Sequence, residues 1–326
     1  MPFFSRTVPP TYKGEERLDK YIASIPGGMN RSRLKSGVTS IFINGKKQKL
    51  SCKVKAGDQI DIQWEENVPD NISPENIPLD ILYEDENVCV VNKRQGMVTH
   101  PAAGNWSGTL VNALLFHWGR QAVPELTDCP DSQILANRRP GIVHRLDKET
   151  SGVIITAKNR DAQEFLSLQF RNHAGLVKEY IAICCGRPPH QHGTVRTWIV
   201  RDPKNRKRFK ASEDGQQGKF AETHYRCISC YGNYSLMKIR IATGRTHQIR
   251  VHMKHLNCPV LGDGLYARPD KKFPKATLML NSSRLKIMIP GKEEPSVFVS
   301  PTPVRFLEVM KILKRDFKKT VLPRDR

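Results

Sequence analysis

The chain has 326 residues, 38% of them hydrophobic and 7% aromatic, which suffices to bury the cores of about two domains. With 53 Lys and Arg against 32 Asp and Glu, the net charge of +21 favours a polyanionic partner, nucleic acid ahead of an anionic membrane surface. The sequence contains neither a signal-peptide core nor an apolar run of membrane-spanning length, so it predicts a cytoplasmic protein with no membrane partner.

The N-terminal part of the chain predicts a loose arm over residues 1–15, followed by a small domain over residues 16–66. In "RLDKYIASI" the apolar residues recur at helical spacing, and Asn30 is a suitable N-cap for a second short helix. The cations of that second helix are candidates for phosphate contact, namely Arg31, Arg33 and Lys35.

Strand signals follow within the small domain. The stretch "IFINGKKQKL" is an apolar strand closed by an Asn-Gly turn, and it carries Lys46 and Lys47 beside the turn, where both suit phosphate contact. "VKAGDQIDIQW" adds another turn and an alternating strand. Two helices and a small sheet therefore fit in residues 16–66.

An acidic, proline-broken linker is expected over residues 67–79. No Lys or Arg occurs between Trp64 and Asn92, whereas acidic residues accumulate there and prolines interrupt the chain. The positive charge is therefore concentrated elsewhere, including the stretch "RDPKNRKRFK" and a basic tail over residues 317–326. We expect the stretch to contact nucleic-acid phosphates through Arg206, Lys207 and Arg208. A solvated face is the alternative for each of these charge runs.

Residues 80–316 predict one large domain of mixed α and β structure. Strand-like runs such as "VCVVN", "VIITA", "YIAICC" and "LMKIRIA" alternate with helix-like segments such as "GTLVNALLFHWG", "DAQEFLSLQF" and "TPVRFLEVMKILKRDF". "AETHYRCISCYGNYSLMKIRIATG" predicts two paired strands around "YGN". The whole chain is thus expected to be α+β.

Metal and nucleotide sites are not expected. Cys227 and Cys230 stand at zinc-like spacing, but no second cysteine pair follows, so we expect ordinary thiols of a reduced protein. The histidines of "HQIRVHMKH" could share a helix face, but without nearby acids or thiolates they are better explained as residues of a basic face. Neither "GxGxxG" nor "GxxxxGK" occurs. Any chemistry would therefore come from side chains without a cofactor.

The strongest chemical candidate is Asp147 in "GIVHRLDKETSG", where His144, Arg145 and Lys148 surround one carboxylate. A turn or cap is the alternative explanation for such an Asp. Cations keep a carboxylate ionised, and an ionised carboxylate can attack an electron-poor carbon or accept a proton. A single carboxylate among cations suits a leaving group that departs as a stabilised anion, such as a nucleobase.

Four sequence blocks and the front segment resemble known protein families. "HRLDKETSGVIITAK" resembles the signature of the RluA/RluD family of pseudouridine synthases, and three further blocks agree in order: "LYEDENVCVVNKRQGMVTHP", "KEYIAICCG" and "GRTHQIRVHMKHLNCPVLGDGLY". The front segment resembles an S4 RNA-binding domain. The last block departs from the family pattern, with Asn281 and Ser282 in place of the usual "HA" and Ile289 in place of His.

The resemblance implies a small α/β S4-like domain, then a large mixed and mainly antiparallel sheet that forms the catalytic domain. It makes Asp147 the catalytic carboxylate, Arg245 its ion-pair partner, and Tyr180 the residue that stacks on the target uracil and is proposed to help remove its C5 proton. Arg145 would fill the gap that the flipped nucleotide leaves. For Tyr180 a core position in a strand is the alternative, and for Arg245 a phosphate clamp.

The resemblance implies isomerisation of uridine to pseudouridine in structured RNA, most often large-subunit ribosomal RNA, with no cofactor, no metal and no nucleotide. The detached base is rejoined through C5 after it has been flipped out of the stack. A monomer is favoured. Two alternatives stay open, a non-catalytic RNA-binding assembly factor and a glycosylase that releases the free base.

Overall fold

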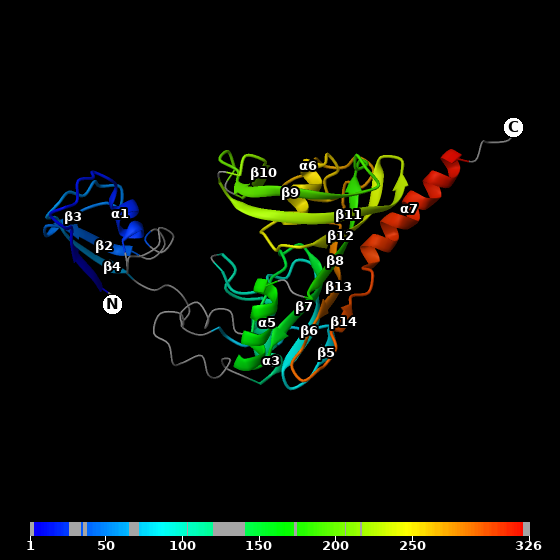
Figure 1. Ribbon diagram of the computed structural model, residues 1–326, viewed down its shortest axis with the longest axis horizontal. Coiled ribbons are helices and arrows are strands. Elements are labelled where there is room, and N and C mark those ends of the chain that lie inside the picture. Colours follow the sequence, from blue (N-terminus) through cyan, green and yellow to red (C-terminus); the bar gives the residue numbers. More distant parts are fainter. Residues whose placement is uncertain are drawn as a thin grey trace. The chain divides into compact units, whose positions relative to one another are not determined.

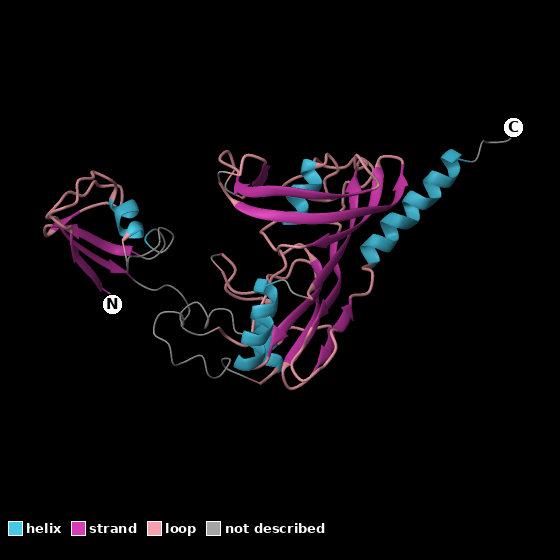
Figure 2. Cartoon of the chain, in the orientation of Figure 1, coloured by secondary structure: helices cyan, strands magenta, loops and turns pink. Residues whose placement is uncertain are grey.

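The computed structural model describes residues 3–25, 34, 38–64, 72–102, 104–119, 141–172, 175–205, 207–215 and 217–321. The chain divides into two compact units, Met1–Asp70 and Asn71–Arg326. Figure 1 labels the elements, and Figure 2 shows that strands dominate the larger unit. No helix among the described residues combines the length and the apolarity needed to cross a membrane.

The smaller unit is a four-stranded antiparallel sheet covered by a helix. The strands β1 (Phe3–Thr7), β2 (Val38–Ile43), β3 (Lys46–Lys47) and β4 (Gln59–Trp64) lie in the order β1-β4-β2-β3. The expected first helix is α1 (Leu18–Ser24), whose Leu18 and Ile22 are fully buried against Ile60 and Ile62 of β4. Asn44 and Gly45, both with positive φ, form the expected turn between β2 and β3.

One expectation about this unit was wrong. Residues 3–7 are not part of a loose arm, because they pair with residues 59–63 as the edge strand β1. The sequence pattern did not predict this strand, because the segment has few apolar side chains and Pro9 and Pro10 follow it closely. Lys46 and Lys47 are exposed on β3, as expected. The predicted second helix and its Arg31, Arg33 and Lys35 lie outside the described residues.

The larger unit is built on a ten-stranded mixed sheet. Its strands are β5 (Ile81–Glu84), β6 (Val88–Lys93), β7 (Ser151–Ala157), β8 (Val177–Cys185), β9 (His192–Arg201), β10 (Phe209–Ser212), β11 (Lys219–Tyr231), β12 (Tyr234–Ile241), β13 (Leu280–Ile287) and β14 (Ser296–Val299). Nine follow the order β10-β9-β11-β12-β8-β13-β7-β6-β5, and β14 pairs with β13. Only the β13–β7 pair is parallel among the described strands, so the sheet is mainly antiparallel, as expected.

Within the described residues, four helices flank this sheet (Figure 1). They are α3 (Leu110–His117), α5 (Arg160–Asn172), α6 (Gln248–His255) and α7 (Val304–Val321). A capping box starts α3, in which Thr109 and Asn112 satisfy each other's backbone N–H groups. Ala162 and Leu166 of α5 are buried against β6 and β7, whereas α6 lies against β9 and β11. The predicted helices and strands of the larger unit are thus confirmed.

Two predicted boundaries shift. The second half of the expected linker packs on the larger unit: the Ser73 carbonyl accepts a hydrogen bond from Asn112, and Ile77 and Leu79 contact the main core. At the other end the basic tail does not begin at residue 317, because α7 continues to Val321. Residues 322–326 lie outside the described part of the chain.

Candidate active site

Asp147 lies in the loop that leads into β7 at the middle of the sheet. Leu146 is buried, and its carbonyl accepts a hydrogen bond from Thr99 Oγ1 at 2.9 Å. The Asp147 carbonyl accepts the Thr150 N–H at 3.0 Å, which closes a turn. After the loop, β7 passes so close to β13 that a Cβ at Gly152 would collide with the Ser282 carbonyl. The loop that carries Asp147 therefore has both of its ends fixed, while 19% of the Asp147 side chain stays exposed.

Lys93 holds this loop through hydrogen bonds to backbone carbonyls. It is 1% exposed, and its Nζ donates to the carbonyls of Met97 at 2.8 Å, Arg94 at 3.0 Å and Lys148 at 3.3 Å. Burial lowers the pKa of the Lys93 ammonium to about 7. Three backbone dipoles thus hold this cation in place next to Asp147.

Arg250, from the first turns of α6, is the cation that faces the Asp147 carboxylate. Its Nη1 lies 3.4 Å from Asp147 Oδ2. Its other nitrogens are held by Asp263, with Nε to Oδ2 at 2.7 Å and Nη2 to Oδ1 at 2.8 Å. Asp263 is fully buried and also accepts the N–H groups of Leu265 and Tyr266. The bidentate pair fixes the guanidinium plane and leaves one nitrogen for Asp147.

The expected ion pair between Arg245 and Asp147 was wrong. Arg245 is exposed, and its Nε donates at 2.9 Å to the carbonyl of Phe220, near the start of β11. Both arginines belong to the same motif, "GRTHQIR", and the sequence alone offered no way to rank them. The deciding residue, Asp263, lies 13 positions after Arg250 in a loop that no local pattern places.

His247 is the second group beside the carboxylate. Its Nε2 lies 3.8 Å from Asp147 Oδ2, and its Nδ1 shares a hydrogen bond with the Tyr266 hydroxyl at 2.8 Å. Its backbone is left-handed, with φ of 55°, a conformation that non-glycine residues rarely adopt. Burial lowers the pKa of His247, opposed by the Asp147 charge, so the imidazole is neutral at pH 7.

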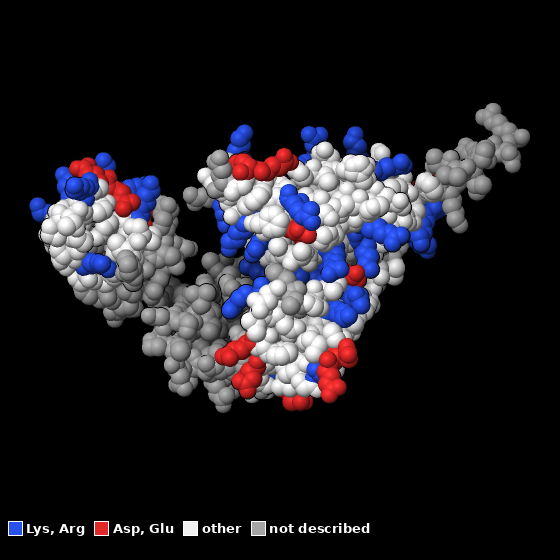
Figure 3. Space-filling view, viewed as in Figure 1, with Lys and Arg blue, Asp and Glu red and all other residues white. Residues whose placement is uncertain are grey.

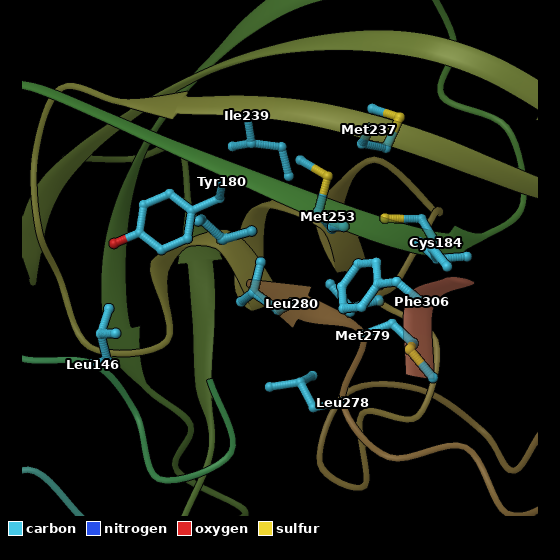
Figure 4. Close-up of a cluster of buried hydrophobic side chains, with 14 of the residues drawn as sticks. Leu146, Tyr180, Cys184, Met237, Ile239, Met253, Leu278, Met279, Leu280 and Phe306 are labelled. Atoms are coloured by element: carbon cyan, nitrogen blue, oxygen red, sulfur yellow. The ribbon is translucent and has the colours of Figure 1, made fainter. Parts of the chain in front are cut away.

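Tyr180 presents its ring to the same cavity from the centre of β8. It is 7% exposed and packs with Leu146 and Leu280, and its hydroxyl points away from the cluster around Met253 and Phe306 (Figure 4). Burial raises the pKa of the Tyr180 hydroxyl well above its ordinary value, against a smaller opposing effect of Ser282. The phenol is therefore neutral in the free protein.

These side chains meet in a cavity of about 100 Å³, whose lining includes Arg145, Asp147, Tyr180, Arg245, His247 and Arg250. All four site residues expected around the target base are thus present, and two unforeseen residues, His247 and Arg250, join them. The cavity can admit a flat, polar ligand beside an anchored carboxylate.

Of the three sequence neighbours of Asp147 that were expected to be cations, His144 is neutral. Burial lowers the pKa of His144 to about 3, because this imidazole is stacked on Phe170 and its Nε2 accepts the Ile155 N–H at 3.0 Å. It is a neutral structural residue. Arg145 and Lys148 are exposed.

The departures from the family pattern form buried structure. Asn281 is fully buried, accepts a hydrogen bond from Ser151 at 2.6 Å and donates to Ser300 at 3.4 Å. Arg305 of α7 donates to the same Ser151 hydroxyl at 2.6 Å. Ile289 is a core residue, 1% exposed. Asn281 and Arg305 tie the start of β7, and hence the loop that carries Asp147, to β13 and α7.

The metal-like sequence patterns hold no metal site. The Cys227 and Cys230 Sγ atoms are 3.3 Å apart beside a hollow of about 380 Å³, whose lining does not include Asp147. His252 is fully buried between Thr197 and Thr223, and burial lowers its pKa to about 4, so it is not part of a basic face. No group of three potential ligands able to hold a metal occurs within the described ranges.

Lys and Arg side chains gather across the middle of the larger unit, whereas acidic side chains lie mostly above and below (Figure 3). Among the predicted contacts, Lys207 is exposed and Arg208 is partly buried, with an Nε that has no hydrogen-bond partner among the described residues. Arg206 lies outside those residues.

A carboxylate fixed beside cations and an aromatic ring, in a strongly basic mixed-sheet protein, defines an enzyme that acts on nucleic acid. The family described as RNA pseudouridylate synthase matches residues 87–255. Ribosomal large subunit pseudouridine synthase D of Borreliella burgdorferi is 43% identical over 297 residues, covering 89% of this chain and 87% of that protein. An uncharacterized RNA pseudouridine synthase of Aquifex aeolicus is 40% identical over 307 residues, covering 90% and 93%.

Among solved structures, human RNA pseudouridylate synthase domain containing 4 superposes with a TM-score of 0.54 at 24% identity, covering 72% of this chain and 92% of that one, which supports the fold. The chain belongs to the RluA family of RNA pseudouridine synthases. It is an RNA pseudouridine synthase, and its substrate is RNA.

Proposed function

We propose that this enzyme converts uridine to pseudouridine at specific positions of large-subunit ribosomal RNA. The observation that carries the chemistry is the Asp147 carboxylate, held at the cavity by Arg250 and flanked by Tyr180. The choice of RNA rests on the relatives named ribosomal large subunit pseudouridine synthase D, from Borreliella burgdorferi and Pasteurella multocida. These are 43% and 35% identical to this chain.

The proposed reaction starts with the target uridine flipped out of the RNA stack, at a cost of a few kcal/mol that protein–RNA contacts must offset. Arg145, exposed at the rim of the cavity, would occupy the vacated space. Asp147 then acts on the sugar, as a nucleophile at carbon or as a base, and the glycosidic bond breaks. The base turns and its C5 bonds to the sugar C1′, which releases Asp147 if the carboxylate had attacked there. The C5 proton is then lost and N1 is protonated, so that product and substrate are isomers.

The role of Tyr180 is mainly to stack on the base. Because its hydroxyl is buried and neutral, the phenolate that would accept the C5 proton is disfavoured before RNA binds. The ring, by contrast, lies directly in the cavity wall beside Leu280. Arg250 stabilises the Asp147 anion, and Asp263 keeps Arg250 in place.

The test is to incubate in vitro transcribed 23S ribosomal RNA with the purified protein and to map carbodiimide-dependent stops of reverse transcription. New stops at one or a few uridines support the proposal. Free uracil in the supernatant would indicate a glycosylase instead. Tight RNA binding without either product would indicate an assembly factor that uses the cavity only for binding.

A further inference from the structure

Lys178 is a buried cation that the catalytic residues do not use. It lies on β8, two residues before Tyr180, so both side chains point to the same face of the strand. Lys178 is 7% exposed, and its Nζ lies 6.0 Å from the centre of the Phe170 ring. A Cβ placed on Gly244, which lines the cavity, would be 3.8 Å from this Nζ. The ammonium therefore lies directly behind the cavity wall, at a point where the wall has no side chain.

No carboxylate compensates this charge among the residues that the structure describes. The adjacent Glu179 points to the opposite face, where its oxygens lie 3.1 Å from Lys238 Nζ and 3.4 Å from Arg284 Nη1. The charged neighbour of Lys178 is Arg245, a second cation, and the nearby imidazole of His144 is neutral. Burial and the Arg245 charge lower the pKa of Lys178 to about 8.

Two neighbouring cations without an acid form an incomplete site. A buried charge is normally paired, because taking it out of water is costly. The Arg245 guanidinium is fixed through Nε to the Phe220 carbonyl, and its remaining nitrogens are available at the rim of the cavity. The missing partner is an anion small enough to reach Lys178 past Gly244.

We propose that Lys178 and Arg245 form a phosphate-binding site that holds an RNA backbone phosphate next to the target uridine. The inference rests on the proposed function, because it takes the flipped base to occupy the adjoining cavity. A phosphodiester offers two oxygens, one for a guanidinium and one for an ammonium, and RNA carries such a group at every nucleotide. The site adds affinity for the RNA strand that carries the flipped nucleotide.

The site predicts a specific pH dependence of RNA binding. In the free protein the Lys178 pKa is about 8, and a bound phosphate raises it toward its ordinary value near 10.5. At pH 7 and below the ammonium is almost fully charged in both states, so affinity is nearly constant there. Above pH 8 the complex must take up a proton, and affinity falls, by roughly sixfold between pH 7 and pH 8.8.

The experiment measures the Kd of the full-length protein for in vitro transcribed 23S ribosomal RNA at several salt concentrations and at pH 7.0, 8.0 and 8.8. The variants are Lys178→Met, Lys178→Arg and, as the matched control, Lys238→Met, which removes a lysine of the neighbouring strand whose charge Glu179 already compensates. Pseudouridine formation is measured in the same samples.

We expect Lys178→Met to weaken binding at pH 7 by about five- to tenfold, to lower the salt slope by about 0.7–0.9, and to abolish its share of the pH dependence. Lys178→Arg should keep the affinity and salt slope but lose the pH dependence, and Lys238→Met should match wild type. The inference is overturned if Lys178→Met keeps the wild-type salt slope and pH dependence. RNA binding that follows this pattern without any pseudouridine would refute the proposed function while keeping the phosphate site.

Discussion

Two cationic regions border the same cavity, and they differ in how their charge is balanced. On one side Arg250 is held by Asp263 at 2.7 Å and faces Asp147 at 3.4 Å, so two carboxylates meet one guanidinium. On the other side Lys178 and Arg245 are neighbours, and no carboxylate lies within ion-pair distance of either among the described residues. The cation of the first region, Arg250, has its carboxylate partners without RNA, which suits a role in the reaction. The cations of the second region, Lys178 and Arg245, would gain an anionic partner only when a ligand binds.

The largest effect on pseudouridine formation is expected from removing the Asp147 carboxylate, which Arg250 faces. Asp147→Asn should abolish pseudouridine formation, by at least about a thousandfold, because an amide can neither attack carbon nor accept a proton. The fold and the RNA affinity should be preserved, since Arg250 keeps its bidentate partner Asp263. Turnover above a few per cent of wild type in a single-turnover assay would show that another residue acts on the sugar.

Removing the central cation should instead destabilise the protein. Arg250→Met leaves Asp263 buried without its partner, and breaking a buried ion pair in this way costs about 3–5 kcal/mol. Urea unfolding measures this cost. Adding Asp263→Asn in the same chain should recover part of the stability but none of the activity. A single variant as stable as wild type would mean that the pair is not the anchor of the region.

Lys93 offers an intermediate case, a buried cation balanced by carbonyl dipoles instead of carboxylates. Its pKa is about 7 in the folded protein and near 10.5 when unfolded, so between these values the unfolded chain binds more protons and stability rises with pH. The gain is about 2 kcal/mol from pH 7 to pH 8.5. Lys93→Met should remove this gain, as measured by urea unfolding across that range. Identical pH slopes for both proteins would contradict the assignment.

The smallest effect on chemistry is expected from the unit that carries no cavity residue. Deleting residues 1–70 should leave the saturating rate of pseudouridine formation within about threefold, while it weakens binding and flattens its salt dependence by about 0.7–0.9 per lost phosphate contact. Lys46 and Lys47 are among the exposed cations lost. A folded truncated protein that modifies no RNA would place part of the active site in the smaller unit.

Local sequence signals predicted the architecture well where the determinants are local. Helical periodicity found α1, α5 and α7, and turn residues found the hairpins at Asn44–Gly45 and Gly232–Asn233. The motif around Asp147 also predicted the location of the cavity. Its residues Arg145, Leu146, Asp147 and Thr150 form part of the cavity lining. The edge strand β1 escaped, since only pairing with the distant β4 makes residues 3–7 a strand.

The charge balance of the site could not be predicted in the same way. In the sequence, His144 and Arg145 appear to surround Asp147, but His144 is neutral under Phe170 and Arg250 arrives from a helix about a hundred residues later. Likewise, nothing in "KEYIAI" shows that Glu179 turns away from Lys178 to pair with Lys238. Which acid meets which base depends on sheet register and loop packing.

The most direct test of this division compares the rate and the affinity of one variant, Arg245→Met, with wild type. We expect a Kd for 23S ribosomal RNA about tenfold higher than that of wild type and a single-turnover rate at saturating protein within about threefold of wild type, because the proposed role of Arg245 is to bind phosphate, whereas Arg250 contacts Asp147. An unchanged Kd with a rate reduced by orders of magnitude would show that Arg245 acts on Asp147 and does not bind phosphate.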